Sequence, residues 1–247
     1  MDHKRFLSAL ILSLFSVFAI CTVSVPGQIP NQLAQDFVAG SAPSAEQVAQ
    51  FEKDAAAKPD DLRLTRKLGK AYFFEFFDFG DQAAVPKAQK TLEKALTLTK
   101  DDPETLAYLG SLQILRAVRL EKGDAKKQKA SYDRGFELIK LAEKLDPRNG
   151  AVTSVVSTSY LWLPDSYGMA PHVVEMLEGM IKGMGPYFKK FADHGQQRIL
   201  LTLGQAYLKT GASEKAKVAF DDGLAVNTTS REAKLLRSEL ERMNKKY

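Results

Sequence analysis

The sequence predicts an all-α protein in which helical hairpins stack in series. Residues 201–220, LTLGQAYLKTGASEKAKVAF, hold two helical patterns separated by a Thr210-Gly211 turn. A hairpin of this kind cannot bury its apolar faces alone, so it needs neighbours. Small residues also recur at intervals of 41, 47 and 47 along the chain, namely at Gly69, Gly110, Ser157 and Gly204.

The hairpin over residues 201–220 shows why a small residue is needed. Gly204 on the first helix lets the second helix approach closely, because it has no side chain to separate the two backbones. We expect the small Ala216 to face Gly204, and Tyr207 to fill the space beside them.

The N-terminal half follows the same plan with longer units. Ser44 and Gln47 form a capping-box pattern that starts a helix, which we interpret as a half repeat. Residues 60–100 predict the first full hairpin, with an unusually long connection over residues 73–86. Residues 101–147 predict a second hairpin whose two long helices project beyond their neighbours.

The C-terminal half contains a weaker hairpin, a clear one and a terminal helix. Residues 148–185 predict the third hairpin, with a helix break at Leu163-Pro164, because the residue before proline disfavours helical geometry. The fourth hairpin spans residues 195–227. Ser230 then caps a last helix with one apolar side, which is typical of a helix that closes a stack.

The fourth hairpin resembles a tetratricopeptide repeat. Leu203, Gly204, Tyr207, Ala216 and Phe220 match the family pattern, although the chain's intervals exceed the family unit of about 34 residues. The resemblance covers residues 44–247. The unequal lengths of the repeats resemble those of divergent exported bacterial members of the family. It implies a right-handed solenoid of about four hairpins, with the half repeat at the N-terminus and a C-terminal capping helix.

The N-terminus predicts export. Residues 1–27 combine a short basic region with the apolar stretch 6–20, and a turn-rich linker follows over residues 28–43. Three fates fit this leader: cleavage, retention as a membrane anchor, or lipidation at Cys21. Each places the helical domain, residues 44–247, in the periplasm or anchored facing it. We expect membrane contact only through the N-terminal segment.

Composition is that of an ordinary globular protein. Hydrophobic residues make up 45% and charged residues 26% of the chain, and the formal net charge is +5. No basic stripe with interleaved aromatic residues is evident, so we predict no nucleic-acid partner. The one cysteine lies in the leader, which excludes a disulfide framework in the helical domain.

Motifs of known chemistry are missing from the sequence. It contains no Gly-x-Ser-x-Gly, no phosphate-binding glycine loop and no His-Glu-x-x-His. Paired carboxylates, such as Asp101-Asp102, fall at expected helix ends, where they complement the positive end of the helix. We therefore predict a protein that is not an enzyme and that holds no cofactor and no metal.

The resemblance implies that the first helix of each hairpin lines a concave surface. That groove would be basic at one end and apolar in the middle, which suits an acidic and apolar peptide or helix. The predicted partner-binding residues are Arg63, Arg66, Lys70, Phe73, Phe74, Leu115, Trp162 and Tyr167. Other lining positions are Glu104, Ala107, Ser111, Ile114, Ser154, Thr158, Leu161, Arg198, Leu201, Gln205 and Leu208.

Two aromatic clusters have more than one interpretation. The five phenylalanines within residues 73–79 cannot share one helical face, so they form core with an extra helical turn, or they line a binding surface. Trp162 and Tyr167 beside Pro164 either pack an irregular turn or form an apolar notch.

These patterns leave two main hypotheses about function. The first is a non-catalytic interaction scaffold of the bacterial cell envelope that holds a protein or peptide in its groove. The second is a small-ligand or lipid binding component of a transport system, with a pocket among residues 73–79, Trp162 and Tyr167. An enclosed apolar cavity favours the second, and an open groove favours the first.

Overall fold

The computed structural model describes residues 43–245. The predicted leader (residues 1–27), with Cys21, and almost all of the predicted linker (28–43) lie outside the described residues, so the expectations about them stay predictions. Within the described range, no helix combines the length and apolar character that crossing a bilayer requires.

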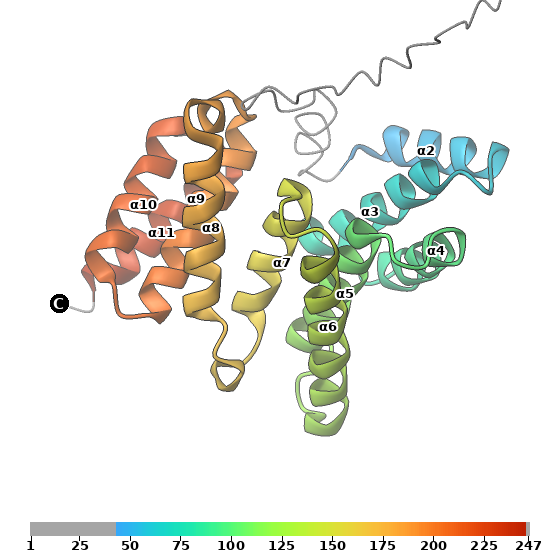
Figure 1. Cartoon of the computed structure of the whole chain (residues 1–247), viewed down its shortest axis with the longest axis horizontal. Helices are drawn as coiled ribbons and strands as arrows, with labels where there is room; N and C mark the ends of the chain where they lie inside the picture. Colours follow the sequence, from blue (N-terminus) through green and yellow to red (C-terminus); the bar gives the residue numbers. More distant parts are fainter. Residues whose placement is uncertain (1–42, 246–247) are drawn as a thin grey trace, which may run out of the picture.

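The described part of the chain is helical throughout and contains no β-strand, as the sequence predicts (Figure 1). Two short 3-10 helices, η1 (Asp165–Tyr167) and η2 (Gly185–Lys190), flank α8. The α-helices are α2 (Ala45–Ala57), α3 (Leu62–Phe79), α4 (Ala84–Leu98), α5 (Pro103–Arg119), α6 (Ala125–Leu145), α7 (Gly150–Trp162), α8 (Ala170–Met184), α9 (Asp193–Lys209), α10 (Ser213–Val226) and α11 (Arg231–Asn244).

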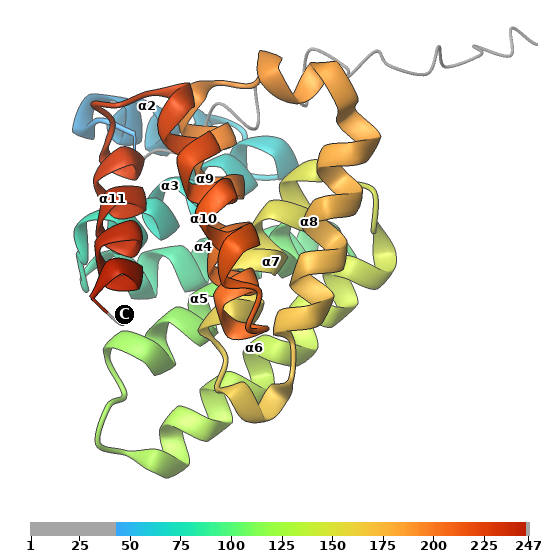
Figure 2. The ribbon, with the colours of Figure 1, turned by 90° about the vertical axis from the view of Figure 1, so that its left-hand side faces the viewer.

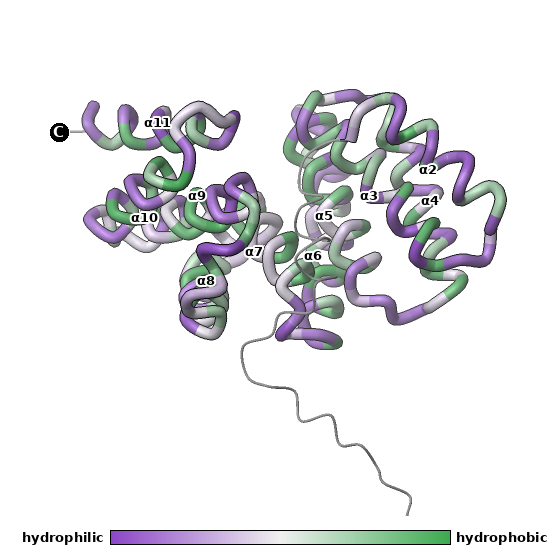
Figure 3. Tube along the Cα trace, turned by 90° about the horizontal axis from the view of Figure 1, so that it is seen from above, coloured by the Kyte–Doolittle hydropathy of each residue, from purple (hydrophilic) through white to green (hydrophobic). Residues whose placement is uncertain are grey.

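These helices form a stack of four tetratricopeptide-like hairpins. The pairs are α3 with α4, α5 with α6, α7 with α8, and α9 with α10, while α2 precedes them and α11 covers the last pair. Seen from above, hydrophobic and hydrophilic segments alternate along the helices, as expected when each has one buried side (Figure 3). The predicted half repeat, hairpins and terminal helix are confirmed.

The helix ends follow the predicted local signals. The Ser44 side chain accepts a hydrogen bond from the Gln47 amide at 3.3 Å, and the Gln47 side chain accepts one from the Ser44 amide at 2.8 Å. Ser230 caps α11 through the Ala233 amide at 2.9 Å. Helix α7 stops at Trp162, directly before Leu163 and Pro164. The sequence therefore predicts both the capping box and the proline break correctly.

The long connection predicted after the first helix is in fact additional helix. Helix α3 continues through the phenylalanine-rich stretch to Phe79 and ends where Gly80 adopts a left-handed conformation, with φ of 74°. Phe76 is core at 1% exposure, whereas Phe79 is 74% exposed. The extension matters for the site, because it carries Phe77 and Asp78 toward the second half of the stack.

The second hairpin projects from the stack as predicted. Helix α6 has 21 residues, the longest of the described helices, and α5 runs along it. Figure 2 shows the turn between α5 and α6 extending beyond the neighbouring hairpins. Lys122 and Gly123 at this turn are exposed, which fits a solvated connection.

The small residues on the first helices mark the tightest approaches. A Cβ atom added to Gly69 would lie 2.7 Å from the Leu92 side chain, and one added to Gly110 would lie 2.8 Å from the Gly135 carbonyl oxygen. In the fourth hairpin, the Phe220 ring rather than Ala216 lies nearest to Gly204. The predicted close approach is confirmed, but its partner is the larger side chain.

Successive hairpins are joined by a repeated hydrogen bond. A tyrosine on the first helix of one hairpin donates its hydroxyl proton to a glutamate on the preceding second helix, at 2.5–2.7 Å. The pairs are Tyr72 with Glu52, Tyr160 with Glu143, and Tyr207 with Glu178. Tyr207 therefore fixes the offset between hairpins, in addition to filling space within its own.

Some contacts between first helices, and between α9 and the terminal helix α11, keep the family spacing of about 34 residues, although the intervals between the small residues do not. Each joins a residue to a carboxylate 34 positions later. The pairs are Lys70 with Glu104, Arg198 with Glu232, and Gln205 with Glu239.

Replacing Gly204 by alanine should destabilise the protein. The new methyl group would lie 2.2 Å from the Phe220 ring, so we expect a loss of about 2–3 kcal/mol in unfolding free energy. Gly179→Ala is the matched control, because no atom lies within 4 Å of its added Cβ. That change should stabilise helix α8 by about 0.5–1 kcal/mol. Urea denaturation of both variants measures the difference, and equal effects would contradict the close approach.

Replacing Tyr207 by phenylalanine should remove the Glu178 hydrogen bond and lower stability by about 1 kcal/mol at neutral pH. Burial, and secondarily the bond to Glu178, raise the pKa of Tyr207 to about 12. The unfolded chain loses this proton first, near pH 10. The stabilisation is therefore complete below about pH 10 and lost as pH rises toward about 12. Urea denaturation across that range should show the wild type and Tyr207→Phe converging, and a constant difference would refute this account.

Candidate functional site

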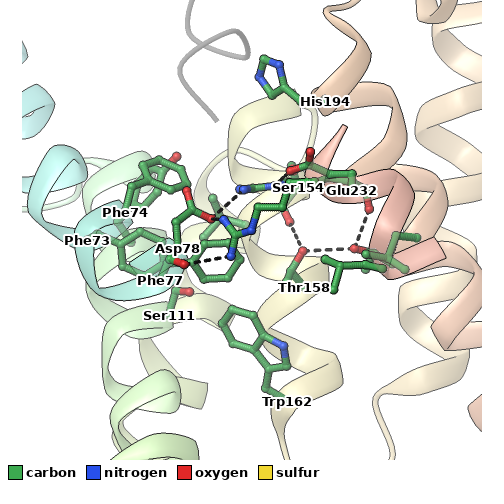
Figure 4. Close-up of a pocket in the computed structure, with 18 of the residues that line it drawn as sticks. Phe73, Phe74, Phe77, Asp78, Ser111, Ser154, Thr158, Trp162, His194 and Glu232 are labelled. Carbon is green, nitrogen blue, oxygen red and sulfur yellow. Dashed lines mark hydrogen bonds and ion pairs between the residues drawn. The ribbon is translucent and has the colours of Figure 1, made fainter. Parts of the chain in front are cut away.

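The first helices of the four hairpins, together with α11, enclose a hollow of about 310 Å³ that is partly open to solvent. We call it the concave hollow. It lies where α3 and α5 face α7, α9 and α11 (Figures 1 and 4). The tetratricopeptide resemblance predicts that first helices line the concave side, and the lining residues confirm it for all four hairpins.

An aromatic wall forms the α3 side of the concave hollow. Phe73 stacks on Phe77 with ring centroids 5.8 Å apart, and Phe77 meets Trp162 of α7 at 5.5 Å. Tyr108 of α5 packs edge-on against Phe73 at 5.3 Å. Phe77 and Trp162 are only partly buried, so their rings present apolar surface to whatever enters.

Asp78 lies beside this wall with a side chain that is 2% exposed. Its Oδ1 accepts hydrogen bonds from Arg198 Nη2 at 3.0 Å and from Arg231 Nη1. Figure 4 shows Asp78 in the middle of the hollow, between the phenylalanine rings and the helix that carries Ser154 and Thr158. A carboxylate this deeply buried requires positive partners, and here the partners come from α9 and α11.

Guanidinium groups also hold the end of helix α3. Arg119 donates to the Phe76 and Phe77 carbonyl oxygens at 2.7 and 3.0 Å, and Arg231 donates to the Asp78 carbonyl oxygen at 2.9 Å. These carbonyls are the negative end of the helix, so cations are favoured there. Burial and then the charge of Arg231 lower the pKa of Arg119, which nevertheless stays protonated.

Arg198 connects the aromatic wall to the acidic groups. Its guanidinium lies 4.8 Å from the centroid of the Phe77 ring, and it also pairs with Glu232 at 3.4 Å. A cation over an aromatic face and beside two carboxylates is held in one orientation. Arg198 therefore sets the shape and the charge of the hollow at its centre.

Hydroxyl groups form the opposite side. Thr158 donates to the Ser154 carbonyl oxygen at 3.0 Å, and its hydroxyl lies 3.3 Å from that of Thr202. Thr202 donates to the Arg198 carbonyl oxygen at 2.8 Å. Near the end opposite Trp162, His194 Nε2 is buried and has no hydrogen-bond partner among the described residues. The hollow thus combines an aromatic side, a cationic centre and a polar side.

The structure brings together three of the eight residues predicted to bind a partner. Phe73, Phe74 and Trp162 line the concave hollow. Leu115 is 2% exposed and is not among the lining residues, and Arg63 is exposed outside the hollow. Six other predicted lining positions do belong to it, namely Ser111, Ser154, Thr158, Arg198, Leu201 and Gln205.

Trp162 and Tyr167 do not form a shared notch. Trp162 turns toward Phe77, whereas the Tyr167 ring packs on Phe136 at 5.1 Å. The Tyr167 hydroxyl donates to Asp133 at 2.5 Å. Tyr167 is therefore an element of packing between α6 and η1, separated from the hollow, and the notch interpretation is wrong.

The basic end of the predicted groove is engaged in ion pairs. Arg66 lies 2.7 Å from Asp102 and 3.2 Å from Glu104, and Lys70 Nζ lies 2.5 Å from Glu104. Burial raises the pKa of Asp102, but hydrogen bonds from Thr105 and the charge of Arg66 outweigh it, so that the net pKa is lowered. Arg66 and Lys70 thus join α3 to α5, and their role toward a partner stays a prediction.

Sequence reasoning missed the most central residues of the hollow. In the sequence, these residues cannot be told from ordinary surface charges; they are Asp78, Arg119, Arg231 and Glu232. Asp78 and Arg231 are 153 positions apart, and no local spacing connects them. The one available signal was the continuation of the α3 helical pattern through Phe77, which would have placed Asp78 on the helix.

Titratable groups elsewhere do not gather into a metal-binding cluster. No group of three or more histidine, cysteine, aspartate or glutamate side chains with that geometry occurs in residues 43–245. His172 lies 2.6 Å from Glu143, and Glu143 also accepts the hydroxyl bond from Tyr160. These contacts join α6, α7 and α8 outside the concave hollow.

Changing Glu104 to glutamine should destabilise the protein by about 3 kcal/mol in urea denaturation. It removes the negative charge that compensates the Lys70 ammonium, and Lys70 is 8% exposed. Adding Lys70→Met should recover much of the loss, because the buried positive charge is then gone as well. Glu93→Gln on the exposed face of α4 should change stability by less than about 0.5 kcal/mol. A Glu104 variant as mild as this control would contradict a structural role for the pair.

Comparisons with known proteins find a similarity to solved structures alone. No protein-family model matches the chain, and no curated protein does. Among solved structures, the chain is similar to the crystal structure of MamA, with 21% sequence identity and a TM-score of 0.43. That match covers 72% of this chain and 85% of the other. At this level the similarity assigns neither a family nor a role, so the function is argued from the concave hollow.

Proposed function

We propose that this protein is a non-catalytic interaction scaffold that binds an acidic and apolar segment of a partner protein in the concave hollow. One observation carries the proposal: an aromatic wall, with Phe77 and Trp162 partly exposed, lies directly beside the guanidinium of Arg198. Aromatic and arginine side chains in a pocket are the groups that dominate binding energy at protein interfaces.

Charge and size define the partner's chemistry. Three guanidinium groups and two carboxylates line the hollow, namely Arg119, Arg198, Arg231, Asp78 and Glu232. A volume of about 310 Å³ is at the lower end of the range for ligand sites, so the hollow suits one or two anchoring side chains. An aromatic or aliphatic side chain beside an aspartate or glutamate fits both properties.

The lining residues favour binding over catalysis. Asp78 and Glu232 are both engaged by Arg198, which keeps them from acting as free bases. Thr158 and Thr202 bond backbone carbonyl oxygens, and His194 makes no hydrogen bond to a lining hydroxyl. The hollow therefore lacks a nucleophile that a neighbouring base activates.

The site of action that we propose is the bacterial cell envelope. Support comes from the sequence of residues 1–27, whose basic start and apolar core are typical of an export signal. The protein would be periplasmic, or anchored facing the periplasm through its N-terminal segment, with Cys21 as a lipidation candidate. Its partner would then be another envelope or exported protein.

A second candidate function is binding of a small ligand or lipid for a transport system. The observation that favours it is the partial enclosure of the concave hollow, which a small molecule with an aromatic or aliphatic body would fill. Native mass spectrometry of the purified full-length chain separates the two candidates. A stoichiometric small molecule in the wild type that is lost in Phe77→Ala would support the second and count against the first.

Binding of an acidic–apolar peptide should depend on the aromatic wall. The chain has a single tryptophan, Trp162, so a tryptophan-free peptide with alternating aspartate and phenylalanine should change its fluorescence on binding. We expect Phe77→Ala to weaken this affinity at least tenfold, about 1.4 kcal/mol. Val218→Ala is the control, because Val218 is 60% exposed on α10 and does not line the hollow.

The specificity of this peptide provides the second half of the test. Replacing its aspartates by asparagine should weaken binding to the wild type, because Arg198 and Arg231 would then face neutral groups. Equal affinity for the acidic and neutral peptides, or equal losses in Phe77→Ala and Val218→Ala, would refute the proposed site.

A further inference from the structure

The buried carboxylate of Asp78 is unusual in its position on the helix. It lies in the last turn of α3, where the helix dipole disfavours negative charge. Its side chain is nevertheless 2% exposed and receives two guanidinium groups. The dipole of α3 therefore disfavours a carboxylate at this position. The contacts with Arg198 and Arg231 compensate for its burial.

Those contacts cross the concave hollow. Helix α3 packs along α2, α4 and α5, whereas Arg198 and Arg231 belong to α9 and α11, which pack with the last hairpins. The bonds from Asp78 join residues 120 and 153 positions away. One side chain thus bridges the two sides of the hollow, as Figure 4 shows for Asp78.

The surroundings of this carboxylate have the composition of a receptor site. Phe74 and Phe77 lie 5.7 and 4.8 Å from the Arg198 guanidinium, and Trp162 lies next to Phe77. A group that entered here would meet aromatic rings with its body and guanidinium donors with its acidic end. Asp78 belongs to the chain itself and provides only the acidic end of such a group, without the body.

We propose that Arg198 and Arg231 form a carboxylate-binding site that Asp78 occupies as an internal ligand, and that its external ligand is a carboxylate attached to an aromatic or apolar body. This rests on the proposed function in one respect, because it names the group through which a partner would be held. An incoming carboxylate takes the Asp78 bonds and releases the bridge across the hollow.

The test uses the full-length chain with phenylacetate and phenylacetamide as probes. The two molecules share an aromatic body, but only phenylacetate carries a negative charge. Asp78→Ala removes the internal carboxylate, so its Tm should fall. Phenylacetate at ten times its dissociation constant should then raise that Tm by about 3–6 °C. Phenylacetamide should not raise it, and the Tm of the wild type should respond to phenylacetate less than that of Asp78→Ala, because Asp78 competes for the same two guanidinium groups.

Two further variants make the result specific. Adding Arg231→Gln to Asp78→Ala should abolish the phenylacetate shift, because one of the two guanidinium groups is gone. Asp133→Ala removes a carboxylate that bonds Tyr167 and Lys129 outside the hollow, and phenylacetate should not rescue it. If Asp78→Ala does not fold alone, its refolding from urea should recover helical circular dichroism with phenylacetate and not with phenylacetamide.

Each outcome has a defined meaning. No rescue of Asp78→Ala, equal rescue by both probes, or rescue that survives Arg231→Gln overturns the carboxylate site. Selective rescue that fails with Arg231→Gln supports it, even if the acidic peptide binds to no form of the protein. Absence of peptide binding together with selective rescue would refute the peptide-binding function and still support the carboxylate site. The two failures are therefore distinguishable.

Discussion

The two helices of a hairpin approach each other closely at small residues, and this close approach governs how the hairpins stack. Gly69, Gly110 and Gly204 each have a neighbouring atom within 2.8 Å of where a Cβ would lie. Ser157 takes the equivalent place in α7 and is 1% exposed. Because each pair is this close, its apolar residues extend to the outer sides of the hairpin, and only the next hairpin can bury them.

Stacking then determines where the concave hollow can form. The tyrosine–glutamate bonds join the first helices α3, α7 and α9 to the preceding second helix, and this keeps those first helices on one side of the stack. Helix α7 is central, since its Val155 and Trp162 contact both hydrophobic cores. Helices α3 and α5 consequently face α7, α9 and α11 across the concave hollow. The extension of α3 brings Phe77 and Asp78 into that hollow.

Charges within the stack fall into two kinds. Arg66 and Lys70 are held by Asp102 and Glu104 between adjacent helices, a contact between neighbours in the stack. Asp78, Arg198 and Arg231 instead join α3 to α9 and α11, across the concave hollow. Ion pairs of the first kind support the fold, because their helices are already in contact. Ion pairs of the second kind bridge an accessible hollow, where the proposed external carboxylate would exchange with Asp78.

Sequence patterns were enough to predict the helical class, the hairpin order, the Ser44 and Ser230 caps, the break before Pro164 and much of the concave lining. These features depend on periodicity, turn chemistry and local sterics, which act over a few residues or repeat along the chain. Three contacts became visible only in the folded protein: Phe220 against Gly204, Tyr167 away from the hollow, and Asp78 with Arg198 and Arg231. Those contacts depend on helix lengths and on the curvature accumulated over four hairpins, which no local pattern in the sequence encodes.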